Sequence, residues 1–158
     1  MREVTPRGLD AIVRHEGLVL TPYRDSAGFL TIGVGHLLTR SELSSGKIRL
    51  GLEAVKWNEG ITKEQAMHLL RIDLDRAEQA VFADTGRIPL TDAQFDALVS
   101  FVFNVGVGAY EGSTLRRMML TGHLDQVPTQ MLRWNRAGGR VIPGLASRRA
   151  SEASLWNA

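Results

Sequence analysis

Residues 92–105 restrict the fold of this chain more than any other segment. Thr91 followed by Gln94 forms a capping box, which predicts a helix that begins at Asp92. Apolar residues occupy almost every face of this helix: Phe95, Ala97, Leu98, Val99, Phe101, Val102 and Phe103. A helix that is apolar all round has to be enclosed by other elements. The sequence therefore predicts a buried helix at the centre of a helical core.

A second capping box, Thr62 with Gln65, begins a longer amphipathic helix. One stripe along this helix carries Met67, Leu70, Leu74, Ala77 and Val81. The pattern continues to about Asp84, so we expect roughly 20 residues and a length of about 30 Å. A helix of this length is suited to connect two lobes.

The C-terminal sequence predicts three shorter helices, over residues 113–121, 124–134 and 147–156. Their methionines, Met118, Met119 and Met131, have helical spacing and are expected to fill the core. Residues 39–60 are rich in Ser, Gly and Glu, with a short amphipathic piece over residues 52–57. We expect this segment to form a loop or a short helix.

Glu16 lies at the end of a predicted N-terminal helix. Thr5 and Pro6 are typical of a helix start, and Gly17 is typical of a stop. The apolar stripe of this helix is formed by Leu9, Ile12 and Val13. Position 16 is next on that stripe, so the pattern points the carboxyl group at the interior. Burial disfavours a charged carboxylate, and a glutamic acid that keeps its proton can act as an acid. The alternative is a Glu16 that is solvated or paired with an arginine.

Residues 20–36 predict a small β-hairpin. Residues 20–24 include Pro22 and suit an edge strand or a loop. Residues 25–28 have turn composition, in which Asp25 can accept hydrogen bonds from nearby backbone N–H groups. Residues 29–36 alternate as a strand does, with Leu30, Ile32, Val34 and His36 on one face and Phe29, Thr31, Gly33 and Gly35 on the other. Asp25 is therefore expected near the turn of the hairpin.

Thr31 is predicted to lie on the strand face that carries two glycines, whereas Leu30, Ile32 and Val34 face the core. Glycine in a strand often allows a ligand or another backbone to approach closely. The pattern therefore favours a groove beside Thr31. A bulge in a short twisted hairpin would explain the glycines equally well.

Composition excludes several classes of protein. The chain has 158 residues, of which 44% are hydrophobic and 23% are charged, and this predicts one compact domain with a sizeable core. It has no cysteine, so neither a disulfide framework nor a thiolate metal site is available. The histidines, at positions 15, 36, 68 and 123, do not form a zinc-binding pair on a helix face. We expect no metal and no cofactor.

The N-terminal sequence lacks the apolar run of a secretion signal, and no uninterrupted apolar span of about 18 residues occurs in the chain. The sequence thus predicts neither a signal peptide nor a transmembrane segment. We expect the chain to accumulate in the cytoplasm.

Positive charge is concentrated in residues 112–158. This segment contains seven arginines and two acids, a local balance of +5, whereas the whole chain has a net charge of +2. A basic lobe attracts polyanions. No recognisable nucleic-acid-binding module is present, so no nucleic-acid partner is expected. An anionic cell-wall polymer or outer-membrane lipid fits better, and a solvated helical surface explains the charge equally well.

Glu16, Asp25 and Thr31 are separated by eight and five residues, and residues 31–39 read Thr-Ile-Gly-Val-Gly-His-Leu-Leu-Thr. This combination closely resembles the catalytic region of phage-type lysozymes, the T-even endolysin-like muramidases. The similarity extends to residues 62–84 and 97–106, and to the C-terminal motif formed by residues 134–139, 143–145 and 148–149. It covers nearly the whole chain, while residues 39–60 are longer than the T-even pattern and differ from it.

The resemblance implies a single lysozyme domain over residues 1–158, of the α+β class and mostly helical. A small N-terminal lobe, about 1–61, would carry a short antiparallel β-hairpin or sheet. A long connecting helix, about 62–84, would join it to a larger all-helical C-terminal lobe, about 85–158. A cleft would lie between the lobes.

The resemblance also implies hydrolysis, with inversion of configuration, of the β-1,4 bond between N-acetylmuramic acid and N-acetylglucosamine in bacterial peptidoglycan. Cleaving a glycosidic bond needs a proton donor and an electron-rich group that assists water. Glu16 suits the acid, Asp25 on a polar turn suits the ionised partner, and Thr31 can hydrogen-bond the attacking water. The other expected substrate contacts are Gly35, Leu37, Phe103 and Asn104. A C-terminal cap is the alternative role for Asn104.

In phage-type lysozymes an arginine from the C-terminal region pairs with the catalytic Glu. The candidates in this sequence are Arg136, Arg140, Arg148 and Arg149, and the glycines at 138 and 139 leave the choice open. An enzyme of this kind reaches the periplasm and the wall only after the host membrane is permeabilised, so the resemblance implies dependence on a phage holin. We expect a monomer.

Three other functions share some of these features. A lytic transglycosylase acts on the same bond with a catalytic Glu, usually without the Asp and Thr, and leaves anhydro-muramic ends. A non-catalytic wall-binding module would use the same groove without turnover. A metal-dependent amidase fits least well, because the chain has no zinc-binding histidine pair and no cysteine.

Overall fold

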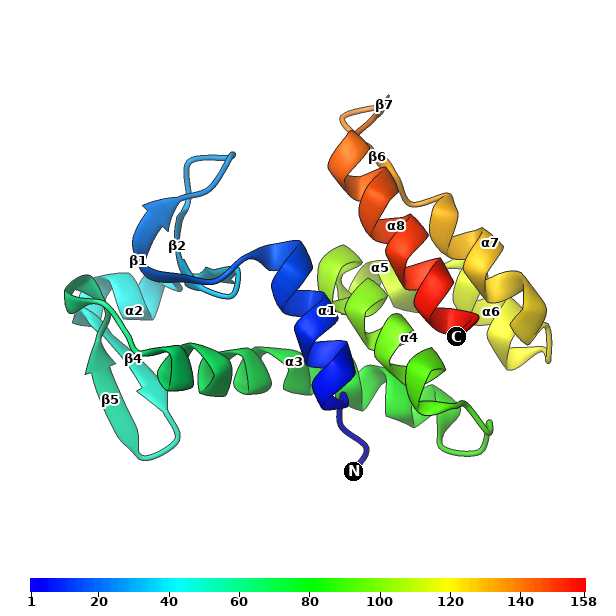
Figure 1. Cartoon of the computed structure of the whole chain (residues 1–158), viewed down its shortest axis with the longest axis horizontal. Helices are drawn as coiled ribbons and strands as arrows, with labels where there is room; N and C mark the ends of the chain where they lie inside the picture. Colours follow the sequence, from blue (N-terminus) through cyan, green and yellow to red (C-terminus); the bar gives the residue numbers. More distant parts are fainter. The chain divides into compact units, whose positions relative to one another are not determined.

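Helices make up most of the chain in the computed structural model, which describes residues 1–158 (Figure 1). The α-helices are α1 (Pro6–Glu16), α2 (Arg40–Ser45), α3 (Lys63–Thr85), α4 (Asp92–Val105), α5 (Val107–Glu111), α6 (Thr114–Leu120), α7 (Val127–Leu132) and α8 (Pro143–Trp156). Two short 3₁₀ helices are η1 (Trp57–Glu59) and η2 (Leu124–Gln126). None of the helices combines the length and the apolar content needed to span a bilayer.

The strands form three small antiparallel sheets. One sheet has the order β1–β2–β3, with β1 at Val19–Arg24, β2 at Leu30–Gly33 and β3 at His36–Leu37. The hairpins are β4 (Lys47–Leu50) with β5 (Glu53–Lys56), and β6 (Arg136–Ala137) with β7 (Arg140–Val141). The predicted class, α+β and mostly helical with small antiparallel sheets, is confirmed.

The chain divides into two compact units. The small unit is Val13–Asp75, and the helical unit combines Met1–Ile12 with Arg76–Ala158. The division falls within α1 and within α3. Residues 1–12, which the sequence analysis assigns to the first lobe, thus belong to the helical unit.

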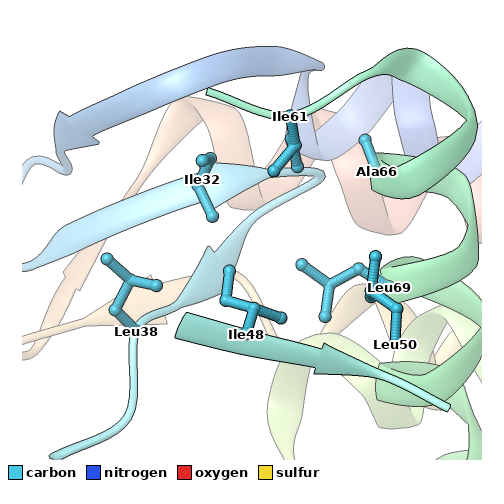
Figure 2. Packing of buried hydrophobic residues seen from close by; sticks show 7 residues of the cluster. All are labelled: Ile32, Leu38, Ile48, Leu50, Ile61, Ala66 and Leu69. Atoms are coloured by element: carbon cyan, nitrogen blue, oxygen red, sulfur yellow. The ribbon is translucent and has the colours of Figure 1, made fainter. Parts of the chain in front are cut away.

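A cluster of aliphatic side chains forms the core of the small unit (Figure 2). Its members are Ile32, Leu38, Ile48, Leu50, Ile61, Ala66 and Leu69. Strand β2, strand β4 and the start of α3 each contribute to it, and Trp57 packs against it while its indole N–H donates to the Glu42 carbonyl over 2.8 Å. This core fixes the strands that carry the predicted site.

The prediction of one continuous strand over residues 29–36 is wrong. Strand β2 ends at Gly33, the chain reverses, and β3 returns beside β2, with Ile32 opposite His36. Gly33 and Gly35 have φ values of +69° and +66°. Only glycine adopts this left-handed region readily. The two glycines therefore mark a turn, which neither the groove nor the bulge interpretation anticipated.

Residues 39–60 form more structure than predicted. Thr39 caps α2 through a capping box with Glu42, and β4 and β5 then form a hairpin. The alternation in β4 is that of a strand buried on one face, with Ile48 and Leu50 inward. The prediction of a loop or short helix is thus correct for α2 and for the 3₁₀ helix η1, and it missed the hairpin.

The apolar helix predicted over residues 92–105 is confirmed as α4, including its capping box of Thr91 and Gln94. Every residue from Phe95 to Val102 is buried. Helix α4 contacts α8, which also contacts α7 (Figure 1). The long helix and its Thr62–Gln65 capping box are confirmed as α3.

The C-terminal half departs from an all-helical lobe. Residues 136–141 form the β6–β7 hairpin, and α5 is an additional helix directly after Gly106. Helix α8 begins at Pro143 rather than at residue 147, because proline suits the first helical turn. Met119 and Met131 are buried as core filler.

Candidate functional site

Glu16 is the last residue of α1, and Gly17 ends the helix with a φ of +78°. Leu9 and Ile12 on the same helix are buried, while Glu16 is half-buried. The side chain is therefore partly shielded, and it is less enclosed than the helical stripe predicts.

The carboxyl group of Glu16 lies directly against Gly35. A Cβ atom added at position 35 would lie 2.6 Å from Glu16 Oε2, closer than real Cβ contacts. The missing side chain of Gly35 is what allows this approach, and the positive φ of the residue allows the β2–β3 turn. The Glu16 carboxylate therefore packs directly against the backbone of Gly35.

Asp25 occupies the β1–β2 turn, as predicted. Its Oδ1 atom accepts hydrogen bonds from the backbone N–H groups of Ala27 and Phe29, each at 2.9 Å. The Asp25 N–H in turn donates to the Phe29 carbonyl. This arrangement is an Asx-type turn, in which a short acid bonds to the backbone that follows it. One carboxylate oxygen is fixed, and Oδ2 makes none of these bonds.

Thr31 lies in β2, the central strand, between Tyr23 on β1 and Leu37 on β3. Side chains directly opposite one another on antiparallel strands share a face. Thr31 is only 2% exposed, and its hydroxyl donates to the Phe29 carbonyl over 3.0 Å. Flanking neighbours thus cover the face that the sequence analysis expects to be open.

Tyr23 is a member of this site that sequence reasoning missed. Its pKa is raised, first by burial and then by the negative charges of Glu16 and Asp25. Both carboxyl groups are thus close enough to Tyr23 to act on its charge. The available signal was the position of Tyr23 near the end of β1, two residues before the turn that holds Asp25.

His36, next to Gly35, is held between two acids. Its Nδ1 lies 2.7 Å from Asp73 Oδ2 on α3, and its Nε2 lies 2.9 Å from Glu42 Oε2 on α2. Burial opposes a charge on the ring, but the Asp73 and Glu42 contacts outweigh it and raise the pKa of His36 to about 9. This cluster ties β3 to both helices and thereby fixes the turn beneath Glu16.

The raised pKa of His36 predicts a loss of stability at alkaline pH. The stabilisation is fully present below the unfolded pKa of about 6.5 and is lost as pH rises through about 9. Between pH 6 and pH 10 the free energy of unfolding should fall by about 2 kcal/mol more in the native protein than in His36→Asn. Urea unfolding at several pH values measures this difference.

The exposed His68 offers the matched control, since His68→Asn should keep the native pH profile. If the free energy of unfolding changed with pH in the same way in the native protein and in His36→Asn, the raised pKa of His36 would be contradicted.

Phe103 and Asn104, the two substrate contacts predicted outside the small unit, lie near the end of α4 in the helical unit. Asn104 does not cap the helix, because Gly106 is the C-cap and its N–H donates to the Val102 carbonyl. Instead, Asn104 Oδ1 accepts from Arg149 Nη2 over 2.7 Å. Phe103 is half-buried and Asn104 is exposed.

A pocket of about 260 Å³ lies beside Asn104 within the helical unit. It is lined by Asn104, Val105, Trp134, Arg136, Leu145 and Arg149. The Trp134 ring meets Phe101 edge-on at 5.7 Å, and the Arg149 guanidinium lies over the same Phe101 at 5.1 Å.

Beneath this pocket is a buried ionic cluster that the sequence analysis did not predict. Glu152 accepts from Ser100, Arg148 and Arg149 at 2.9 to 3.1 Å. Glu152 and Arg149 are each 1% exposed. Burial raises the pKa of Glu152, and the charges of Arg149 and Arg148 act in the opposite direction.

The predicted basic surface needs correction. Arg148 and Arg149 are buried in the cluster with Glu152, and Arg116 forms two hydrogen bonds to Asp84. The arginines of this segment that are exposed are Arg117, Arg133, Arg136 and Arg140. A surface for anionic wall polymer or lipid therefore cannot depend on Arg148 and Arg149.

Five of the predicted site residues lie in the small unit: Glu16, Asp25, Thr31, Gly35 and Leu37. Backbone pairing joins Thr31 to Leu37, and packing joins Glu16 to Gly35. Leu37, which lies opposite Thr31 on β3, is half exposed, at 51%.

Known proteins resemble this chain over its whole length. The endolysin of Salmonella phage P22 is 33% identical over 156 residues, which are 99% of each sequence. The endolysin of Bacillus phage PZA is 34% identical over 157 residues, 98% of this chain and 55% of that protein. The chain thus spans about half the length of this curated relative.

The fold is that of the lysozyme-like class. A crystal structure of a P22 lysozyme mutant matches 100% of both chains with a TM-score of 0.81 and 33% identity. A model of the family described as phage lysozyme matches residues 13–152. The chain therefore belongs to the phage lysozyme family.

Proposed function

We propose that this chain is an endolysin that hydrolyses peptidoglycan at the β-1,4 bond between N-acetylmuramic acid and N-acetylglucosamine. Membership of the phage lysozyme family supports the proposal, as do the relatives named endolysin and lysozyme. The observation that carries it is the position of Glu16, whose carboxyl group packs against Gly35 in the unit that also holds Asp25.

Glu16 is the general acid in this proposal. It protonates the oxygen of the leaving sugar, which otherwise departs as a poor leaving group. Partial burial at the end of α1 keeps this carboxyl group out of bulk water on one side, while the other side is accessible.

Asp25 and Thr31 activate the attacking water. The backbone N–H bonds to Oδ1 hold the Asp25 carboxylate in place and leave Oδ2 to accept the proton of the water. The Thr31 hydroxyl donates to Phe29 and can accept a hydrogen bond from the same water. Attack by a water held opposite the leaving group inverts the configuration at the anomeric carbon.

Substrate contacts are assigned to Gly35 and Leu37 in the small unit and to Phe103 and Asn104 in the helical unit. The exposed apolar side chain of Leu37 and the exposed amide of Asn104 suit a sugar with N-acetyl groups, which offers both methyl and carbonyl surfaces. Action as a monomer and release to the wall through a phage holin complete the proposal. Electrostatic attraction to the anionic wall is assigned to the exposed arginines of the β6–β7 hairpin, Arg136 and Arg140.

Digestion of bare peptidoglycan by the purified protein tests this function. Hydrolysis should release fragments with reducing muramic ends, and mass analysis distinguishes them from anhydro-muramic ends, which are lighter by one water. NMR of the fresh products should show the α anomer first. Anhydro ends would indicate a lytic transglycosylase, and binding to the wall without fragments would indicate a non-catalytic module.

A further inference from the structure

The buried carboxylate of Glu152 fixes the guanidinium of Arg149. Glu152 Oε2 lies 2.8 Å from Arg149 Nε, and Oε1 accepts from Arg149 Nη2 at 3.1 Å. The ring of Phe101 covers one face of the same guanidinium. A planar guanidinium that one carboxylate contacts at two nitrogens of the same edge has a set orientation.

Arg149 in turn determines which side of the Asn104 amide faces outward. A guanidinium has only donors, so it can accept no hydrogen bond and has to meet the oxygen of a carboxamide. Arg149 Nη2 accordingly donates to Asn104 Oδ1 over 2.7 Å. The amide N–H₂ then points away from Arg149, on an exposed side chain that lines the pocket.

The other polar side chains of the pocket are also donors. Trp134 contributes an indole N–H and Arg136 a guanidinium, and Val105 and Leu145 supply apolar surface. With one lone pair of the Asn104 oxygen engaged by Arg149, donor groups outnumber acceptor groups among the side chains of this pocket. The lining therefore favours a ligand that supplies acceptor oxygens.

We propose that Glu152 and Arg149 are positioning residues, which lock the Asn104 carboxamide as a hydrogen-bond donor to a carbonyl or carboxylate oxygen of the substrate. This proposal rests on the proposed peptidoglycan function. The oxygen belongs either to an N-acetyl group of the glycan or to the peptide stem, and both present the same acceptor chemistry.

A double-mutant cycle tests the coupling. Binding of a tetramer of N-acetylglucosamine, which lacks peptide, and of a stem-bearing muropeptide is measured by calorimetry for four proteins: wild type, Asn104→Ala, Glu152→Gln and the double variant. Asn104→Ala should weaken binding of one or both ligands by about three- to tenfold, as expected for one lost hydrogen bond. Glu152→Gln should weaken the same ligand in the wild-type background and have no further effect once Asn104 is alanine.

A Glu152 that merely supports the fold would weaken binding equally in both backgrounds, and this result would overturn the proposal. Loss with the tetramer assigns the oxygen to an N-acetyl group, and loss confined to the muropeptide assigns it to the stem. Wild-type affinity in Asn104→Ala for both ligands would also overturn it.

Asn104→Asp keeps the test decisive if Glu152→Gln does not fold. It retains an oxygen for Arg149 and removes the N–H₂ donor, so it should bind no better than Asn104→Ala. Asn157→Asp, an exposed change of the same charge in α8's C-cap, should bind as wild type. Wild-type cleavage of peptidoglycan with unchanged Asn104→Asp affinity would refute only this inference, whereas a wild type that neither cleaves nor binds would refute the proposed function as well.

Discussion

Glu16→Gln should lower the rate of peptidoglycan cleavage by at least about 10²-fold, the usual contribution of a general acid. Glutamine has nearly the same shape and can still pack against Gly35, but it has no acidic proton to transfer to the leaving oxygen. The loss should therefore appear in turnover, with the fold retained. Release of reducing ends from purified peptidoglycan measures the rate, and circular dichroism verifies the fold.

Glu59→Gln is the matched control, because Glu59 is an exposed glutamate in the same unit. It should cleave at the wild-type rate. Turnover near the wild-type rate in Glu16→Gln would show that Glu16 is not the general acid. Another acidic residue would then have to supply the proton.

Glu152→Ala should reduce the free energy of unfolding by about 3–5 kcal/mol, the usual effect of removing one partner from a buried ion pair. Arg148 and Arg149 would keep their charges in the interior without the carboxylate that now lies 2.8 to 3.1 Å from them. Ser100 would also lose the acceptor of its hydroxyl. Urea unfolding followed by tryptophan fluorescence measures the change.

Glu111→Ala, at an exposed glutamate of the same unit, should stay within about 0.5 kcal/mol of the wild type. A Glu152→Ala protein as stable as this control would mean that the arginines reach solvent or find other acids. The buried cluster would then contribute little to folding.

Local sequence signals predicted several elements of the fold correctly. The capping boxes at Thr62 and Thr91 gave the starts of α3 and α4, because hydroxyl and amide side chains there satisfy free N–H groups of the first turn. The continuous apolar surface of α4 predicted its burial, because apolar side chains on every face have to be covered by other elements. Asp25 was placed correctly at a turn, since its bonds to Ala27 and Phe29 are made within five residues.

Features that depend on distant residues were missed. Alternation over residues 29–36 predicts extended backbone but does not encode where the chain reverses, and the turn at Gly35 exists beside a side chain from α1. The acids that hold His36 come from α2 and α3, and no local pattern links them.

The sequence did contain a signal for the burial of Arg148 and Arg149, namely their helical spacing, which a count of charges does not register. Positions 149, 152, 153 and 156 form one helical stripe, and all four residues are buried. Glu152 is three and four residues after the two arginines, the spacing at which side chains on a helix meet. A charged stripe that also contains Ala153 and Trp156 indicates an internal pair rather than a surface patch.

The contact between Gly35 and Glu16 also limits how this protein can be made more heat-resistant. Replacing glycine with alanine is a standard way to stabilise a protein, because it lowers the conformational entropy of the unfolded chain. It succeeds where the native backbone tolerates a methyl group. At position 35 the methyl would occupy the space of the Glu16 carboxyl oxygen. A library of glycine replacements made to raise thermal stability should therefore leave Gly35 unchanged, because the added methyl group would displace the carboxyl group proposed as the general acid.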